Sequence, residues 1–394
     1  MCIAALWPNF HKRQAAVIRV LHVYRTYFPD PPGGLQEAIR QICISTQPFG
    51  VHNTVFTLSP QPHPAVVARA EATVVRCRSW AAPASCDLGG GDAIVAFRQL
   101  AREADVVHYL FPWPFGDVLH AFAPKKPSIL TYISDIVRQK WLGAAYAPLM
   151  WRTLRNMDAI VFNAPGYAQS SPVLGRGKNF KCLRQIPLGI EESSYARESD
   201  PAILQRLELK NAEPFILFLG VLRYYKGLHI LLEACRHIQG RVVIAGTGPE
   251  GDALHAQAQR LDLKNVVFAG QISNAEKATL LTACRALVLP SHLRSEAYGM
   301  VLVEAAMFGR AMVSCEIGTG TSFVNQHEET GLVVPPEAPQ ELAQAMNKLL
   351  ADDALAARFG QAARQRYETL FSGPALGQAY AQLYRDVLNQ KHKR

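Results

Sequence analysis

Two glutamates, Glu296 and Glu304, lie in the segment SEAYGMVLVEAAMFG (295–309), with seven residues between them. The segment follows the apolar run ALVLP (286–290), which has the composition of a buried strand, so the chain would leave a sheet edge and enter a helix near Tyr298. The first N–H groups of a helix have no partner inside it and carry the positive end of its dipole. The segment therefore predicts a phosphate site formed by the backbone amides of Tyr298, Gly299 and Met300.

The two carboxylates have different predicted surroundings. Glu296 precedes the helix and can reach hydroxyl groups at the sheet edge, whereas Glu304 lies among apolar neighbours such as Val303 and Ala305. A buried ionised carboxylate needs hydrogen-bond donors, and a ribose diol would supply two. The spacing equally allows a structural arrangement, in which Glu296 caps the helix and Glu304 pairs with a nearby arginine.

Two further segments carry residues suited to phosphate chemistry. The segment GVLRYYKG (220–227) follows an apolar strand and places Arg223 and Lys226 at a strand-to-helix turn, where both could neutralise a diphosphate. In the first half of the chain, Gly33 and Gly34 stand directly before a helix. Glycines at that place let a ligand approach the backbone closely.

Alternating strands and helices would position these residues. Strand-helix alternation runs through the first half and begins again in the second, which predicts an α/β fold with two doubly wound parallel sheets. Such sheets bind ligands at the carboxyl ends of their strands, so we expect a deep cleft between two Rossmann-like domains. The predicted strands are 17–24, 51–59, 104–111, 127–134 and 157–164, followed by 214–222, 240–248, 265–272, 285–291, 309–317 and 330–336.

The length of 394 residues favours two domains. We expect them at 1–195 and 196–372, joined by a hinge in the polar segment 188–203, with a final helix at 373–394 that crosses back to the first domain. Residues 1–16 lack the features of a signal peptide and are interpreted as a disordered or loosely docked arm. No apolar run approaches the roughly 20 residues that span a bilayer.

The net charge of +9 is concentrated in the first half. Residues 1–195 hold 20 Lys and Arg against 12 Asp and Glu, whereas residues 196–394 hold 21 against 20. A basic half favours an anionic partner, and the aromatic and basic stretch 136–155 is suited to a membrane surface. The alternatives are a solvated face and a surface helix that packs its aromatic residues inward. The eight cysteines have no metal-ligand spacing and are interpreted as buried free thiols.

Taken together, the two spaced glutamates, their strand context and the YYKG turn resemble glycosyltransferase family 4, retaining transferases of the GT-B fold that use nucleotide-sugar donors. The resemblance covers nearly the whole chain and is strongest from Phe215 to Pro336. Three segments are similar in sequence to bacterial mannosyl- and rhamnosyltransferases of lipopolysaccharide O-chains: SEAYGMVLVEAAMFG (295–309), SCEIGTGTSFVN (314–325) and SDIVRQK (134–140). That similarity implies GDP-mannose or GDP-rhamnose as donor and a glycan or lipid-linked acceptor.

The resemblance also implies roles for the site residues. Glu304 would bind the ribose, and Glu296 would hold hydroxyl groups of the donor sugar. Lys226 and Arg223 would stabilise the diphosphate leaving group. The first domain would bind the acceptor and the second the donor. The phosphates of the donor would further contact Gly33 and Gly34. Its base would contact Gly270, Gln271 and Ile272.

The chain departs from the family pattern in two places. Val221 stands where an arginine usually follows the first glycine of the 220–227 turn, so the role of Arg223 is inferred from its position two residues later. Ile133 stands where many relatives carry a histidine, and the histidine expected near Leu110 is also missing. The remaining candidates on the acceptor side are His108, Ser134 and Asp135.

The expected reaction is front-face attack with retention, after closure of the two halves about the hinge. We expect no metal and no other cofactor. We expect a cytoplasmic enzyme, at most peripheral on the inner face of the membrane, and no nucleic-acid partner. The Ile133 departure leaves open a catalytically weak, nucleotide-sugar-binding subunit, and an epimerase or phosphorylase on the same fold is another alternative. An oxidoreductase is disfavoured because no strand is followed by GxGxxG and a later acid.

Overall fold

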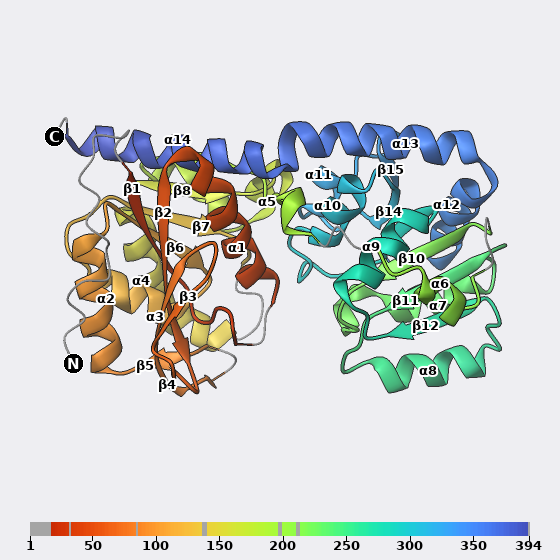
Figure 1. The fold of residues 1–394 in the computed structure, drawn as a ribbon, viewed down its shortest axis with the longest axis horizontal. Coiled ribbons are helices and arrows are strands. Elements are labelled where there is room, and N and C mark those ends of the chain that lie inside the picture. The colour runs from red at the N-terminus through yellow and green to blue at the C-terminus, as the bar shows by residue number, and fades with distance from the viewer. Residues whose placement is uncertain are drawn as a thin grey trace.

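The computed structural model describes residues 17–30, 33–83, 86–135, 140–195, 199–209 and 213–392, so the predicted arm at 1–16 lies outside it. Two α/β units lie side by side, each built around its own sheet (Figure 1). In this part of the chain no helix combines the length and the apolar character needed to cross a membrane.

The first sheet has nine strands in the order β3-β4-β2-β1-β6-β7-β8-β9, with β5 pairing to β4. All pairs are parallel except those of β3 and β5 with β4. The sequence predicted five of these strands and missed β3, β4, β5 and β9. The strands are β1 (Ile18–Val23), β2 (Val51–Ser59), β3 (Val66–Ala68), β4 (Thr73–Ala81), β5 (Leu88–Gly89), β6 (Val106–Phe111), β7 (Ser128–Tyr132), β8 (Ala159–Phe162) and β9 (Leu183–Gln185).

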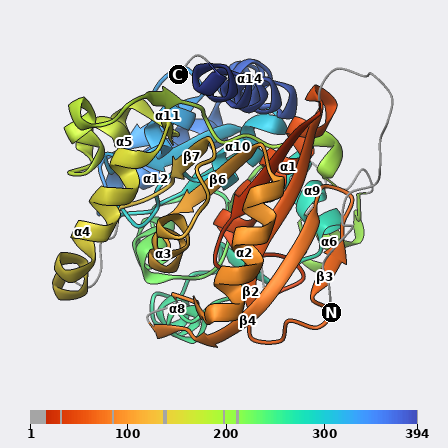
Figure 2. The same ribbon diagram turned by 90° about the vertical axis from the view of Figure 1, so that its left-hand side faces the viewer.

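Helices cover both faces of this sheet (Figure 2). On one face, Val20 and Ile129 of the sheet form a core with Tyr380 and Tyr384 of α14 (Gly373–His392). On the other face, Val107 and Leu130 belong to the core that includes Phe97 of α2 (Gly91–Glu103). The helices are α1 (Gly34–Thr46), η1 (Gln47–Phe49), α2 (Gly91–Glu103), α3 (Pro114–Ala121), α4 (Lys140–Asn156), α5 (Pro165–Ser170), η3 (Leu174–Asn179) and η4 (Glu192–Ser194).

The second sheet has six parallel strands in the order β12-β11-β10-β13-β14-β15, and each coincides with a predicted strand. They are β10 (Phe215–Leu219), β11 (Arg241–Ala245), β12 (Val266–Gly270), β13 (Ala286–Leu289), β14 (Ala311–Cys315) and β15 (Gly331–Val334). Its helices are α6 (Ala202–Arg206), η5 (Tyr224–Lys226), α7 (Leu228–Cys235), α8 (Gly251–Arg260), α9 (Asn274–Ala283), α10 (Met300–Met307), α11 (Thr321–Val324), α12 (Pro339–Ala351) and α13 (Asp353–Arg366).

The chain passes between the two units twice. The first passage follows β9, and the second is the π-helical turn η6 (Tyr367–Phe371), after which α14 (Gly373–His392) packs against α1 of the first unit. Figure 1 shows α13 and α14 along the same side, one over each sheet. The passages are bonded to each other, because the N–H of Ile190 donates to the carbonyl of Phe371 at 2.8 Å and the Tyr367 hydroxyl donates to the carbonyl of Ile190 at 2.8 Å.

Two aromatic side chains of the stretch 136–155 face the protein. Trp151 stacks on Phe180 with ring centroids 6.1 Å apart, and the Tyr146 hydroxyl donates to Asp117. At these residues the inward-packing alternative is correct, because both rings find partners inside the fold. Residues 136–139 lie outside the described residues. The seven described cysteines are free, and Cys43, Cys235, Cys284 and Cys315 are buried.

Candidate active site

A cavity of about 470 Å³ lies between the two units at the carboxyl edges of their sheets. The first unit contributes the start of α1 and Ile133, which follows β7. The second contributes the turn after β10 and the loop that enters α10. The predicted site residues that line this cavity are Gly33, Gly34, Arg223, Lys226, Glu296, Tyr298, Gly299, Met300 and Glu304.

A smaller cavity of about 220 Å³ adjoins the first and shares Gly220 and Val221 with it. Gln271 and Ile272, which follow β12, line it. The Thr247 hydroxyl donates to the side chain of Gln271 at 3.2 Å, so polar groups are present at this end of the site. Gly270 is the last residue of β12, and its carbonyl accepts from the N–H of Gly246 at 2.8 Å.

Glu296 forms a largely buried ion pair with Lys226. The Lys226 Nζ lies 2.5 Å from the Glu296 Oε2, and the Ser291 hydroxyl donates to the same oxygen at 3.2 Å. The two charged side chains are only 13% and 11% exposed. Burial, the largest influence, opposes the charged form of Lys226, but the charge and hydrogen bond of Glu296, together with Tyr225 and Glu304, raise the pKa of Lys226 overall. No side chain caps α10, so the capping alternative for Glu296 is wrong.

The turn that carries Lys226 is fixed to the end of β13. Gly227 has a φ of 71°, and a Cβ there would lie 2.1 Å from the carbonyl oxygen of Pro290, so only glycine fits. The backbone N–H of His292 donates to the carbonyl of Tyr225 at 3.1 Å, and the His292 Nε2 lies 3.1 Å from the carbonyl oxygen of Tyr224. Sequence reasoning missed His292 and Ser291, because no local pattern links them to a turn about 65 residues earlier.

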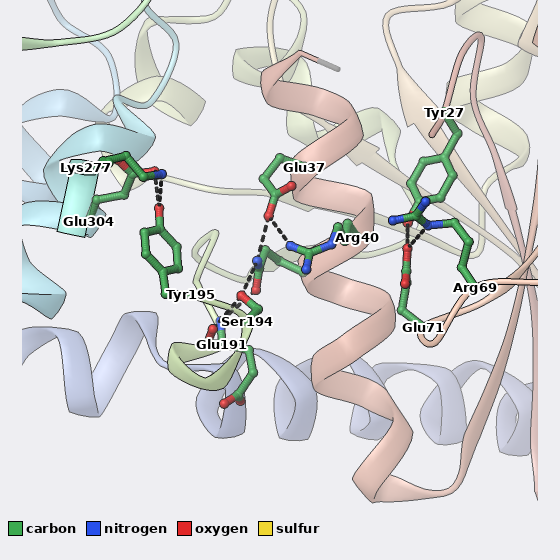
Figure 3. A network of polar contacts seen from close by, with 11 residues as sticks. Tyr27, Glu37, Arg40, Arg69, Glu71, Glu191, Ser194, Tyr195, Lys277 and Glu304 are labelled. Atoms are coloured by element: carbon green, nitrogen blue, oxygen red, sulfur yellow. Dashed lines mark hydrogen bonds and ion pairs between the residues drawn. The ribbon is translucent and has the colours of Figure 1, made fainter. Parts of the chain in front are cut away.

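Glu304 has different partners, on a helix and on the passage between the units. Its Oε1 accepts from the Tyr195 hydroxyl and from the Lys277 Nζ at 3.3 Å, and the Lys277 Nζ lies 3.1 Å from the Tyr195 oxygen (Figure 3). Burial and the Glu304 charge both raise the pKa of Tyr195, which keeps its hydroxyl proton. The cation beside Glu304 is therefore a lysine of α9 and not the arginine of the alternative prediction.

Tyr195 reaches Glu304 from a segment that is bonded to the first unit. The Gln41 side chain on α1 donates to the Ser194 hydroxyl at 2.9 Å and accepts from the N–H of Glu191 at 2.7 Å (Figure 3). Because α1 begins at the cavity with Gly33 and Gly34, these hydrogen bonds link the partner of Glu304 to the helix that forms the other wall of the cavity. Tyr195 lies in the predicted hinge, but no local pattern in the sequence predicts its contact with Glu304.

Helix α10 begins at Met300, two residues later than predicted. Its N-cap, Gly299, has a φ of 81°, a left-handed conformation that glycine adopts without strain. Tyr298 is buried, and its hydroxyl donates to the carbonyl of Leu188 at 3.2 Å, which joins this loop to the passage between the units. The open helix start therefore faces the cavity from a fixed position.

On the acceptor side, Ser134 and Asp135 directly follow Ile133 of the cavity wall but do not themselves line the cavity, whereas His108 lies inside the first unit. Asp135 accepts from the Tyr132 hydroxyl at 2.9 Å and lies 3.8 Å from Arg294 of the second unit, with half-buried Ser134 beside it. His108 is fully buried and bonded to Tyr384 at 3.0 Å, with its pKa lowered by burial. The prediction that His108 contacts the acceptor is wrong, because its side chain lies between the sheet and α14. Leu110 is also buried.

The sequence matches known glycosyltransferases over most of its length. Residues 199–366 match the family model described as glycosyl transferases group 1. The chain is 46% identical to D-rhamnosyltransferase WbpZ of Pseudomonas aeruginosa over 359 residues, which are 90% of this chain and 92% of that protein. The chain belongs to the glycosyl transferases group 1 family.

This glycosyltransferase is also 40% identical to O-antigen chain mannosyltransferase C of Escherichia coli, over 95% of the chain and the whole of that protein. Among solved structures, it is similar to sucrose-phosphate synthase from Thermosynechococcus elongatus, with a TM-score of 0.76, 22% identity and coverage of 95% and 100% of the two chains. The lipopolysaccharide glycosyltransferase WaaG is similar with a TM-score of 0.65, 18% identity and coverage of 93% and 99%. The glycosyltransferase has the GT-B fold.

Proposed function

We propose that this glycosyltransferase transfers a hexose, mannose or rhamnose, from a GDP-sugar to a glycan or lipid-linked acceptor in O-antigen synthesis. The two relatives of high identity, a D-rhamnosyltransferase and an O-antigen mannosyltransferase, support the sugar and the process. The observation that carries the reaction is the Lys226–Glu296 pair beside the open start of α10, in a cavity that both units line.

The donor would lie along the two adjoining cavities. Glu304 would bind the ribose hydroxyl groups in place of the Tyr195 hydroxyl, which occupies its oxygen in this structure. The base would enter the smaller cavity near Gly270, Gln271 and Ile272. The diphosphate would lie against Lys226, Arg223 and the amides of Tyr298, Gly299 and Met300, with Gly33 and Gly34 opposite. Glu296 would orient the sugar hydroxyl groups next to the reacting carbon.

The chemical step would depend on electrostatic stabilisation of the leaving group. The bond between the anomeric carbon and the diphosphate oxygen breaks, and its electron pair stays on the diphosphate. The acceptor hydroxyl oxygen bonds to the same face of that carbon, and its proton passes to a leaving-phosphate oxygen. Lys226 and the start of α10 would neutralise the developing charge, and we propose that no metal or cofactor takes part. Asp135 and Ser134 would position the acceptor.

A transfer assay with a matched donor panel tests this function. The protein is incubated with GDP-mannose or GDP-rhamnose and a lipid-linked saccharide acceptor, and the thermal shift is measured with GDP, UDP, ADP and dTDP. We expect transfer from a GDP-sugar and the largest shift with GDP. Absence of transfer while the donor still binds would support the alternative of a nucleotide-sugar-binding subunit, motivated by Ile133 on the cavity wall.

We also propose that the basic first half contacts the anionic cytoplasmic face of the membrane, as a peripheral protein. The charge of residues 1–195, with 20 Lys and Arg against 12 Asp and Glu, supports this location. Flotation with vesicles tests it: we expect co-migration with anionic vesicles and not with neutral ones, and equal behaviour with both would contradict it.

A further inference from the structure

A second cavity, of about 880 Å³, lies at the end of the first sheet that is opposite to the candidate active site. Ser128, the first residue of β7, lines it, whereas Ile133, just beyond the other end of β7, lines the active-site cavity. A strand of this length spans about 16 Å at about 3.3 Å per residue. The second cavity is therefore separate from the proposed donor site.

The second cavity is strongly basic. Among the described residues that line it, five are Lys or Arg and one is a carboxylate: Lys125, Lys126, Arg152, Lys181, Lys391 and Asp158. The Asp158 carboxylate already accepts from the N–H of Ser128 at 3.0 Å and from Lys181 at 3.2 Å. These cations come from separate parts of the fold, so they are not a charged run along one helix.

Part of this positive charge has a structural explanation. Helices α2 and α4 end at this edge, and cations stabilise the exposed carbonyl groups at helix C-termini. The Lys126 Nζ donates to the carbonyl of Ala104 at 2.8 Å, and the Lys181 Nζ donates to the carbonyl of Asn156 at 2.9 Å. Lys126 and Lys181 therefore complete helix ends.

No such helix-end role applies to the other three cations of the cavity, which are Lys125, Arg152 and Lys391. They are exposed, they come from the α3–β7 loop, α4 and α14, and within the described residues they form no hydrogen bond or ion pair. Partial burial lowers the pKa of Lys391, and Lys126, Lys181 and Lys125 lower it further, against the opposing charge of Asp158. Burial and Arg152 likewise lower the pKa of His120 to about 4. These three side chains gain most from a bound anion.

We propose that this cavity is a binding site for a multiply charged phosphate group, held by Lys125, Arg152 and Lys391. A soluble polyphosphate and the phosphate headgroups of a lipid surface share this chemistry. The site is independent of the donor chemistry, since none of its lining residues belongs to the active-site cavity.

The test compares two triple variants of the full chain. K125Q/R152Q/K391Q removes the three side chains, and R98Q/K264Q/K348Q removes the same residue types at exposed positions elsewhere. Both leave the donor cavity intact, so any binding there contributes equally. Tripolyphosphate binding is measured by calorimetry, and flotation is measured with vesicles of phosphatidylcholine alone or with phosphatidylglycerol. Circular dichroism melting checks that both variants fold.

The outcomes distinguish the two possible sources of the phosphate group, a soluble polyphosphate and a lipid headgroup. A loss of tripolyphosphate affinity of about tenfold or more in the first variant only would support a site for soluble phosphates. A loss of flotation on anionic vesicles in the first variant only would support a site for lipid headgroups. If the two variants bind both probes within about twofold of each other, or if the unmodified protein binds neither, the proposal is overturned. These results do not depend on whether the protein transfers a sugar.

Discussion

The two glutamates of the active-site cavity lie eight positions apart, yet they are held in different ways. Glu296 is bonded to Lys226 and Ser291, both within the second unit. Glu304 is bonded to Lys277 and to Tyr195, which belongs to the passage between the units. The charge at Glu296 is therefore organised before any ligand arrives, whereas the charge at Glu304 depends on where the passage lies. Under the proposed function, Glu296 would serve the reaction, and Glu304 would couple donor binding to closure of the two units.

Removal of Lys226 should have the largest effect. In Lys226→Met we expect kcat to fall by about 10²–10³-fold, because the leaving group loses a positioned cation. The matched control is Lys264→Met, at an exposed lysine paired only with Asp262. Initial rates at saturating donor measure the effect, and a kcat within threefold of the control would remove Lys226 from the proposed role.

Loss of Glu304 should act on binding rather than on turnover. In Glu304→Ala we expect about 10–100-fold weaker nucleotide binding, since hydrogen bonds to a charged group contribute about 1.5–3 kcal/mol and each 1.4 kcal/mol is tenfold. Calorimetry with the nucleoside diphosphate measures the affinity, and Glu341→Ala, at an exposed position of α12, is the control. Unchanged affinity in the Glu304 variant would mean that the ribose lies elsewhere.

A smaller change tests the coupling. In Tyr195→Phe we expect nucleotide affinity to rise by about 2- to 10-fold, because the ribose no longer competes with the tyrosine hydroxyl for Glu304. The matched control is Tyr367→Phe, because the Tyr367 hydroxyl donates to the carbonyl of Ile190 in the same passage. Weaker binding in Tyr195→Phe alone would show that the hydroxyl orients Glu304 for the ligand and does not compete with it.

The smallest effect concerns pH. The pKa of Lys226 is raised above 10.5 in the folded protein, so the stability that its charge contributes is fully present below about pH 10.5 and is lost as the pH rises through the raised value. We expect the difference in unfolding free energy between the unmodified protein and Lys226→Met to be constant from pH 7 to 9.5 and to shrink above pH 10.5. Urea unfolding measures it, and a difference that already falls below pH 9 would contradict the pairing.

The second sheet could be predicted from sequence and the first only in part, for a physical reason. Strands β10 to β15 are short apolar runs between helices, and this pattern is visible in the sequence. Strand β4 (Thr73–Ala81) was not predicted from the sequence, because it contains Arg76 and arginine is a residue type that usually lies at the protein surface. The structure buries this side chain and pairs it with Asp30 at 3.1 Å and the Ser59 hydroxyl at 2.8 Å. Only partners that lie far along the chain make a buried arginine tolerable.

The sequence by itself determined that Glu296, Glu304 and Lys226 meet at a sheet edge, because strand-helix alternation places the ends of parallel strands together. It also determined the open helix start, because Gly299 and the apolar run after it specify α10. The tertiary structure alone decided that Glu296 pairs with Lys226, that Tyr195 occupies Glu304, and that His108 faces α14 instead of the cleft. These outcomes depend on contacts between residues 70 to 276 positions apart. Such contacts are fixed by how distant elements pack, within one unit for Lys226 and for His108 and between the passage and the second unit for Tyr195. No local periodicity encodes that packing.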